Sequence, residues 1–231
     1  MTPLIKASLP LDQTHGWTAC HLANAIAKAD PTESPYRHWY VRDMLPAAVV
    51  EALRKLPFEP LDLGGVSGRR ELHNDARVYL SPEVQAEMPA AQETALAFQS
   101  PTVIAAIQRQ FGAEIEGCRL RIEYARDIEG FWLGAHTDIG VKRFTLVLSL
   151  SDGPQQDHLG TDIFDGPNAW VARSPFQRNA GLIFLPAHDT WHGFERRPIR
   201  GVRKSLIVNY VTAEWRSVEQ LAFPDEPVRA L

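Results

Sequence analysis

Three side chains that bind metals occur in order in the second half of the chain. His136 and Asp138 are two residues apart, and His192 follows further along. Residues two apart on an extended strand point to the same face, so His136 and Asp138 can converge on one ion while Thr137 points away. Two imidazoles and one carboxylate on one side of a metal leave the opposite positions open. The spacing predicts a metal site with His136, Asp138 and His192 as ligands and catalytic residues.

An arginine and a serine follow in the same strand phase. Arg203 and Ser205 share one face of the apolar run 205–211, while Lys204 faces away. A guanidinium offers a planar fork that matches a carboxylate, and a serine hydroxyl can add a further hydrogen bond. The pair therefore predicts a binding site for one end of a dicarboxylic acid.

The order His-x-Asp, His and Arg-x-Ser resembles the Fe(II)/2-oxoglutarate-dependent dioxygenase superfamily over residues 118–212. The resemblance implies Fe(II), 2-oxoglutarate as co-substrate, and O2, with hydroxylation of an organic substrate and release of succinate and CO2. A carboxylate at position 138 favours hydroxylation, since halogenating relatives have a small residue there. Carried over residue by residue, the metal ligands are His136, Asp138 and His192, and the distal carboxylate of 2-oxoglutarate is held by Arg203 and Ser205.

Two of these assignments have rivals in the sequence. His188 would share a face with His192 if the segment between them were extended. In the resembling family an apolar strand beginning at Gly leads through a short loop to His-Gly and an apolar residue. The segments 181–184 and 192–194 match that order, which favours His192. The rivals of Arg203 lie beside Pro198 and Gly201, which indicate a loop; they are Arg196, Arg197 and Arg200.

Tyr124 is a further candidate for co-substrate binding. From 118 to 124 apolar and charged residues alternate, which predicts a half-buried strand with Tyr124 on its apolar face. A buried phenol needs a hydrogen-bond partner. In the resembling family a tyrosine or asparagine on this strand often contacts 2-oxoglutarate. We therefore assign Tyr124 to the co-substrate, with an ordinary core tyrosine as the alternative.

The elements that must position these residues are mostly short strands. The pattern predicts a mainly β fold with α additions, a double-stranded β-helix (jelly roll) core buttressed by N-terminal helices. We expect a single domain over 1–231, with helical and strand additions over 1–115 and the jelly-roll catalytic core over 116–213. Strands are predicted at 36–41, 118–124, 143–150, 160–164, 168–173, 180–185 and 203–212, and helices at 17–29, 47–56, 83–98 and 101–111. A glycine-rich loop at 63–70, with Asn74 and Arg77 after it, is expected near the mouth of the site.

Composition narrows the environment and the partners. Charged residues make up 23% of the chain, the net charge is only -4, and the two signs are interspersed, so we expect neither nucleic acid nor a membrane as partner. Cys20 and Cys118 lie far apart, and no apolar segment resembles a signal core or a membrane span. We expect a cytoplasmic protein, with a homodimer as the default oligomeric state. Its substrate is a small molecule or a peptide side chain that the sequence does not identify.

Two other functional classes are compatible with the same residues. A cupin-like metal enzyme would use Zn, Mn or Fe without 2-oxoglutarate, because this ligand set suits several ions. A non-catalytic jelly-roll binding domain would bind no metal stoichiometrically. Stoichiometric metal binding would exclude the non-catalytic binding domain. Dependence on 2-oxoglutarate would exclude the cupin-like enzyme.

Overall fold

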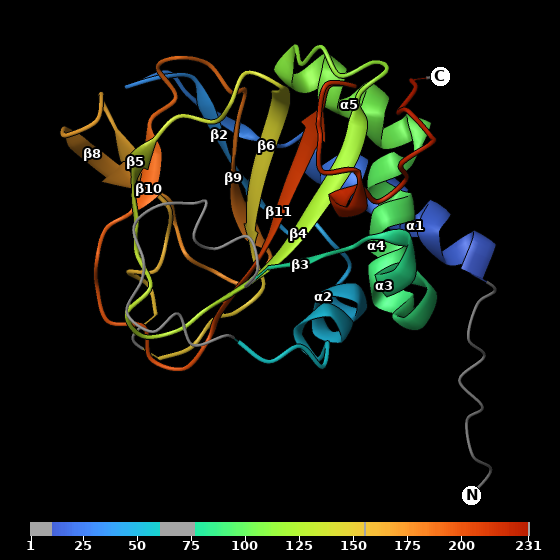
Figure 1. The fold of residues 1–231 in the computed structure, drawn as a ribbon, viewed down its shortest axis with the longest axis horizontal. Helices are drawn as coiled ribbons and strands as arrows, with labels where there is room; N and C mark the ends of the chain where they lie inside the picture. Colours follow the sequence, from blue (N-terminus) through green and yellow to red (C-terminus); the bar gives the residue numbers. More distant parts are fainter. Residues whose placement is uncertain (1–10, 61–76, 155, 231) are drawn as a thin grey trace, which may run out of the picture.

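Two antiparallel sheets form the centre of the protein (Figure 1), which we describe from a computed structural model over residues 11–60, 77–154 and 156–230. The seven-stranded sheet has the order β1-β2-β9-β6-β11-β4-β3 and the four-stranded sheet the order β5-β10-β7-β8. The larger sheet contains β1 (Asp30–Thr32), β2 (His38–Arg42), β3 (Val78–Tyr79), β4 (Arg119–Asp127), β6 (Lys142–Ser149), β9 (Ala180–Phe184) and β11 (Arg203–Val211). The smaller sheet contains β5 (Leu133–His136), β7 (Asp162–Phe164), β8 (Trp170–Arg173) and β10 (His192–Phe194).

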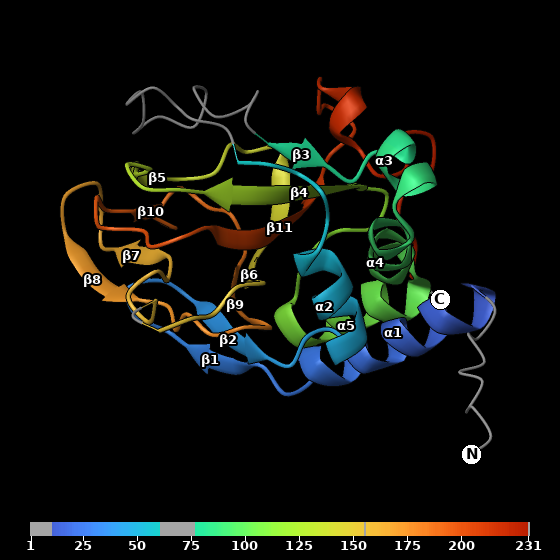
Figure 2. The same ribbon diagram turned by 90° about the horizontal axis from the view of Figure 1, so that it is seen from below.

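The helices lie on one side of the larger sheet and the four-stranded sheet lies on the other (Figure 2). They are α1 (Leu11–Ile26), α2 (Ala47–Arg54), α3 (Pro82–Glu87), α4 (Pro89–Gln99) and α5 (Pro101–Phe111), with a short 3-10 helix η2 (Val218–Gln220) near the C-terminus. The mainly β architecture with helical additions is the predicted fold class. No helix of the described ranges is both long and apolar enough to cross a membrane.

Proline and glycine set the helix boundaries. The helix expected over 83–98 is two helices, because Pro89 has no N–H to donate to the preceding turn and Met88 before it is extended, with φ -122° and ψ 95°. In α5 the predicted ends are confirmed. The Ser100 hydroxyl accepts a hydrogen bond from the Val103 N–H, and Gly112 ends the helix in the left-handed region at φ 69°.

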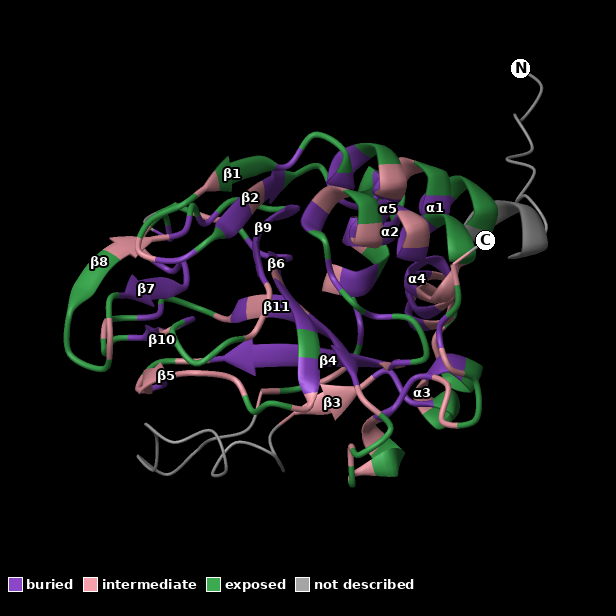
Figure 3. Cartoon of the chain, turned by 90° about the horizontal axis from the view of Figure 1, so that it is seen from above, coloured by how far each residue is buried: buried purple, intermediate pink, exposed green. Residues whose placement is uncertain are grey.

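Alternation along the central strands gives each sheet face a different chemistry. On β4, β6 and β11 one phase is apolar and packs against the helices, as Ile122, Leu146 and Val208 do in the main core. The opposite phase carries polar side chains towards the smaller sheet. Both faces are covered, so β4 is buried almost throughout, whereas β8 at the edge of the smaller sheet is largely exposed (Figure 3).

The N-terminal region contributes strands as well as helices. β2 pairs with β9, and β1, which the sequence pattern did not predict, pairs with β2. These strands extend the same sheet that contains the strands of 116–213. The glycine-rich loop expected at 63–70, and Asn74, lie outside the described residues.

Candidate metal centre

The three predicted ligands converge between two strands of the smaller sheet. His136 ends β5 and His192 begins β10, and these two residues are direct partners in the antiparallel pairing of the strands. Asp138 follows β5 by two residues. One ligand atom from each of the three lies within 4.8 Å of the others, and the two imidazole centroids are 4.4 Å apart. The structure thus brings His136, Asp138 and His192 together as a group that can hold a metal ion.

A glycine allows β10 to approach β5 closely enough for this. A Cβ placed on Gly193 would lie 2.8 Å from the backbone oxygen of Leu133, a distance that real Cβ atoms do not show. Glycine next to His192 is therefore a packing requirement of the site. Sequence reasoning used the His-Gly pair as a mark of resemblance and left β10 unpredicted, because three residues are too few for a periodic signal.

The hydrogen bonds of both imidazoles place the proton on Nδ1, so that Nε2 has the lone pair that can bind a metal. His136 Nδ1 lies 2.9 Å from the Gly134 backbone oxygen, and His192 Nδ1 lies 3.0 Å from that of Thr190. A carbonyl oxygen only accepts, so each Nδ1 carries the proton and each Nε2 has the lone pair. Burial, followed by the neighbouring His136, lowers the pKa of His192 to about 3. His192 is therefore neutral at physiological pH, the form that binds metals.

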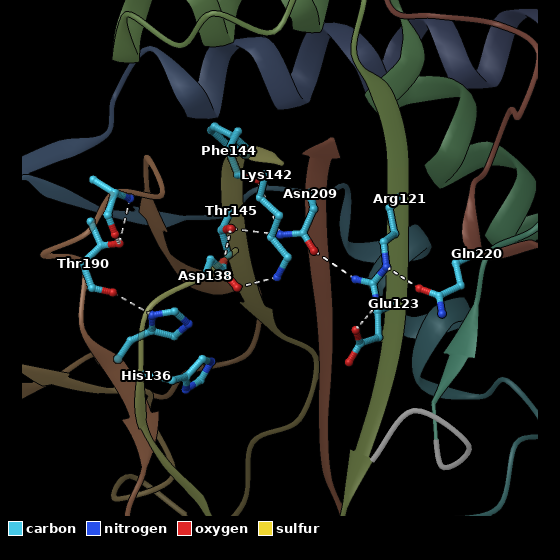
Figure 4. A network of polar contacts seen from close by, with 12 residues as sticks. Arg121, Glu123, His136, Asp138, Lys142, Phe144, Thr145, Thr190, Asn209 and Gln220 are labelled. Atoms are coloured by element: carbon cyan, nitrogen blue, oxygen red, sulfur yellow. Dashed lines mark hydrogen bonds and ion pairs between the residues drawn. The ribbon is translucent and has the colours of Figure 1, made fainter. Parts of the chain in front are cut away.

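Asp138 is held by partners on both of its oxygens (Figure 4). The Lys142 ammonium donates to Oδ1, and the Thr145 hydroxyl donates to Oδ2 at 2.8 Å. Behind Thr145, the Asn209 amide donates to its hydroxyl at 2.9 Å, and Arg121 Nη1 donates to the Asn209 carbonyl oxygen at 2.9 Å. This network spans β6, β11 and β4. It fixes the carboxylate towards the two histidines.

A cavity between the two sheets contains this group and one predicted carboxylate-binding residue, Arg203. Apolar side chains form much of its wall, and acidic and basic side chains lie at its base. The cavity is lined by Arg77, Glu123, Asp127, Phe131, Leu133, His136, Asp138, Thr145, Val147, Thr161, His192, Gly193, Phe194, Arg203 and Ile207. The candidate metal ligands and a guanidinium therefore line the same cavity, as binding of a chelating acid requires.

Arg203 is buried, and its positive charge is partly compensated by groups of the protein. Its Nε donates to the Leu159 backbone oxygen at 2.8 Å, and its Nη1 donates to Asp127 Oδ2 at 2.6 Å. The guanidinium also lies 4.6 Å from the centroid of the Phe194 ring. Its other amino group, Nη2, makes no hydrogen bond to the parts of the chain that the structure describes. That donor remains for a ligand in the cavity.

Ser205 lies on the same face of β11 as Arg203, in the predicted phase. It is buried, and it lines a smaller cavity beside the first one, where Arg203 and Thr161 form part of the wall of both. The structure thus keeps the Arg-x-Ser pair together but places the serine hydroxyl behind the guanidinium, outside the cavity that holds the metal ligands.

The predicted role of Tyr124 needs correction. Its hydroxyl donates to the Leu53 backbone oxygen at 3.0 Å, its ring packs in the main core, and burial raises its pKa to about 12. It faces the helices, because the apolar phase of β4 points to them and the polar phase points to the cavity. Tyr124 is a core tyrosine on the face of the sheet opposite to the site.

The rivals weighed in the sequence lie elsewhere. His188 is exposed and is not in the metal-ligating group. Arg196 and Arg200 are exposed, and Arg197 forms an ion pair with Asp162, away from the lining of the cavity. Arg203 is the arginine of this C-terminal set that opens into the cavity.

Three further charged residues line the cavity, and of these the sequence analysis named Arg77 but missed Glu123 and Asp127. Arg77, which we expected near the mouth, donates from Nη1 to Asp127 Oδ1 at 2.8 Å, and its Nε lies 3.3 Å from Glu123 Oε1. Asp127 therefore bridges Arg77 and Arg203. Glu123 also receives Arg121 Nη2 at 2.8 Å. The signal was present in the charged phase of β4, because the half-buried pattern predicts that phase to be exposed and the structure buries it in the cavity wall.

Comparison with known proteins identifies the fold. No protein-family model and no curated protein matches the sequence. Among solved structures, a prolyl hydroxylase from Trichoplax adhaerens, in complex with a hypoxia inducible factor oxygen degradation domain peptide fragment, matches with a TM-score of 0.56 and 13% identity over 87% of this chain and 91% of that chain.

Two bacterial structures give the same result. A 2OG-Fe(II) oxygenase family oxidoreductase from Burkholderia pseudomallei matches with a TM-score of 0.52 and 16% identity, over 85% of this chain and 90% of that one. A prolyl-4-hydroxylase from Pseudomonas putida matches with a TM-score of 0.51 and 17% identity, over 84% and 94%. The chain therefore has the jelly-roll fold of 2OG-Fe(II) oxygenases, which confirms the predicted fold class.

Proposed function

We propose that this protein is an Fe(II)- and 2-oxoglutarate-dependent oxygenase that hydroxylates a small molecule or a peptide side chain. The observation that carries the proposal is the convergence of His136, Asp138 and His192, within 4.8 Å, in a cavity that also contains the buried Arg203. The likeness to 2OG-Fe(II) oxygenases supports the same reading through the fold.

The donor set fits Fe(II). Two imidazoles that keep Nδ1 protonated present Nε2, and Asp138 supplies a carboxylate oxygen. Two histidines and one carboxylate on one side of the ion are typical of non-haem Fe(II) oxygenases and leave positions for other ligands. Bound Fe(II), with 2-oxoglutarate and O2, supplies the oxidation that hydroxylates the substrate and releases succinate and CO2.

The protein's own residues hold the acid and exclude water. In this proposal Arg203 binds the distal carboxylate of 2-oxoglutarate through Nη2, while Asp127 and the Leu159 backbone oxygen fix the guanidinium. Phe131 and Phe194 pack together beside this end of the cavity, with ring centroids 5.4 Å apart. A desolvated guanidinium binds a carboxylate more strongly than an exposed one does.

Two further expectations belong to this proposal. A peptide side chain is one candidate substrate class, and the peptide held by the Trichoplax enzyme supports it. The cytoplasm is the proposed compartment, because Cys20 and Cys118 are both free thiols.

The test is an anaerobic spectral titration of metal-free protein with Fe(II) and then with 2-oxoglutarate. We expect a weak visible charge-transfer band only when both are present. Arg203→Met should lose the band at 2-oxoglutarate concentrations that saturate the wild type, whereas the matched control Arg196→Met, at an exposed position, should keep it. Absence of metal binding in the wild type would overturn the proposal.

One observation favours a second candidate, a cupin-like metal enzyme without 2-oxoglutarate. Arg203 already has a carboxylate partner in Asp127, so its charge is compensated without any ligand. In that case Fe(II) or another divalent ion would bind, and 2-oxoglutarate would change neither the spectrum nor the metal affinity.

A further inference from the structure

A buried lysine lies beside the candidate metal centre. Lys142 begins β6, and its ammonium contacts Asp138 Oδ1; both side chains are 2% exposed. Lysine is almost never buried unless it is paired. The other carboxylate oxygen receives a hydrogen bond from the neutral hydroxyl of Thr145. Among the described residues, each oxygen of Asp138 therefore has a donor, a charged ammonium on one and a neutral hydroxyl on the other.

Lys142 contributes a buried positive charge at the metal end of the cavity. At the other end the carboxylates and guanidinium groups compensate one another, since Asp127 bridges Arg77 and Arg203. Asp138 and Lys142 together are neutral, whereas Asp138 alone would be an anion in a buried site. A charge a few ångströms from a desolvated ion has a large effect on the binding of that ion.

We propose that Lys142 is a positioning residue that opposes binding of the metal alone and favours binding of the metal together with a dianionic acid. This inference rests on the proposed function. The ammonium competes with a divalent cation for Asp138, and it attracts the negative charge that 2-oxoglutarate brings. In a site with this charge, bound metal raises the affinity for the acid, and bound acid raises the affinity for the metal by the same factor.

Thr145 provides the matched control. Thr145→Val removes the other hydrogen bond to Asp138 without changing the charge of the site, whereas Lys142→Met removes the charge with similar side-chain volume. If Lys142 only orients the carboxylate, the two variants should behave alike. If its charge matters, metal affinity and acid affinity should change in opposite directions in Lys142→Met alone.

The experiment uses Mn2+, whose free-ion EPR signal reports binding and which needs no anaerobic handling. Mn2+ is titrated into wild type, Lys142→Met and Thr145→Val, and 2-oxoglutarate is then titrated into the Mn2+-loaded proteins. We expect Lys142→Met to bind Mn2+ about tenfold more tightly and 2-oxoglutarate about tenfold more weakly. Thr145→Val should change both affinities less and in the same direction.

Equal or weaker Mn2+ binding by a folded Lys142→Met protein, checked by circular dichroism, would overturn the inference. Lys142→Gln serves if the methionine variant does not fold. The wild type gives an independent check, because 2-oxoglutarate must raise its Mn2+ affinity. If the wild type binds no Mn2+ with or without the acid, the proposed function itself fails. If the wild type binds Mn2+ but Lys142→Met and Thr145→Val behave alike, this inference fails and the proposed function stands.

Discussion

Arg203 and Asp127 face each other across the antiparallel strands β11 and β4, with Arg203 Nη1 2.6 Å from Asp127 Oδ2. Burial lowers the pKa of Arg203, and the Asp127 carboxylate opposes that shift. Because Asp127 also accepts from Arg77, a single carboxylate holds two guanidinium groups at the base of the cavity. The arginine that we assign to the acid is thus kept in place, and kept charged, by a buried anion.

Asp127→Asn is expected to lower the stability of the ligand-free protein. The change leaves two buried guanidinium groups without their shared carboxylate, a loss of the kind that costs about 3–5 kcal/mol. A carboxylate ligand can replace the lost charge, so 2-oxoglutarate with Mn2+ should raise the melting temperature of this variant more than that of the wild type. Differential scanning fluorimetry measures both effects. Asp157→Asn, at an exposed position, is the control and should show neither.

The histidine pair 188 and 192 gives a direct test of the metal ligands. His192→Ala removes a ligand of the cluster, whereas His188→Ala removes an exposed side chain four residues away. Loss of a residue that only supports a ligand typically weakens metal binding about 10–100-fold, so loss of the ligand itself should exceed that range. We expect His192→Ala to retain no stoichiometric Fe(II) after desalting and His188→Ala to retain it. The reverse result would assign the third ligand to His188.

Asp138→Ala should abolish hydroxylation once a substrate is found. The change removes the carboxylate ligand and leaves the Lys142 ammonium next to the metal position without its partner. Succinate formation from 2-oxoglutarate, measured with and without substrate, reports the reaction. Full activity in this variant would exclude Asp138 as a ligand.

The sequence predicted which residues of a strand share a face better than it predicted what each face contacts. The two-residue period placed Arg203 and Ser205 together, and it placed Tyr124 with the apolar residues of β4, as the structure shows. The assignment of Tyr124 to the co-substrate requires that apolar face to point towards the site. The N-terminal helices cover it instead, so the charged phase of β4 lines the cavity. Periodicity separates two faces, and only tertiary packing decides what each of them meets.

Lys142 shows a second limit of the sequence. Its partner Asp138 lies beyond the end of β5, so their contact depends on how the chain turns between β5 and β6. No periodic signal describes such a turn. The convergence of His136, Asp138 and His192 was easier to predict, because histidine and aspartate at a spacing of two carry a specific chemistry whatever the exact end of the strand.

Tyr36 is expected to tolerate the loss of its hydroxyl. That oxygen is buried and has no hydrogen-bond partner among the described residues, whereas the buried Tyr210 hydroxyl donates to the Phe98 backbone oxygen at 2.7 Å. Removing a paired buried group costs about 1–2 kcal/mol, and removing an unpaired one can stabilise the protein. Urea unfolding should therefore show a loss of stability for Tyr210→Phe and no loss for Tyr36→Phe. An equal loss in both variants would show that the Tyr36 hydroxyl has a partner in solution.

The metal-free protein should become less stable as the pH falls below about 6.5. Burial lowers the pKa of His192 from 6.5 to about 3, so between these values the unfolded chain takes up a proton that the folded protein does not. The unfolded state binds more protons in this window, and the free energy of unfolding decreases with decreasing pH. At pH 5.5 the loss from this one residue is about 1.4 kcal/mol relative to neutral pH. Urea unfolding at pH 7.5, 6.5 and 5.5 should show this slope in the wild type and a shallower one in His192→Gln. An unchanged slope in His192→Gln would mean that His192 takes up its proton as readily in the folded protein as in the unfolded chain.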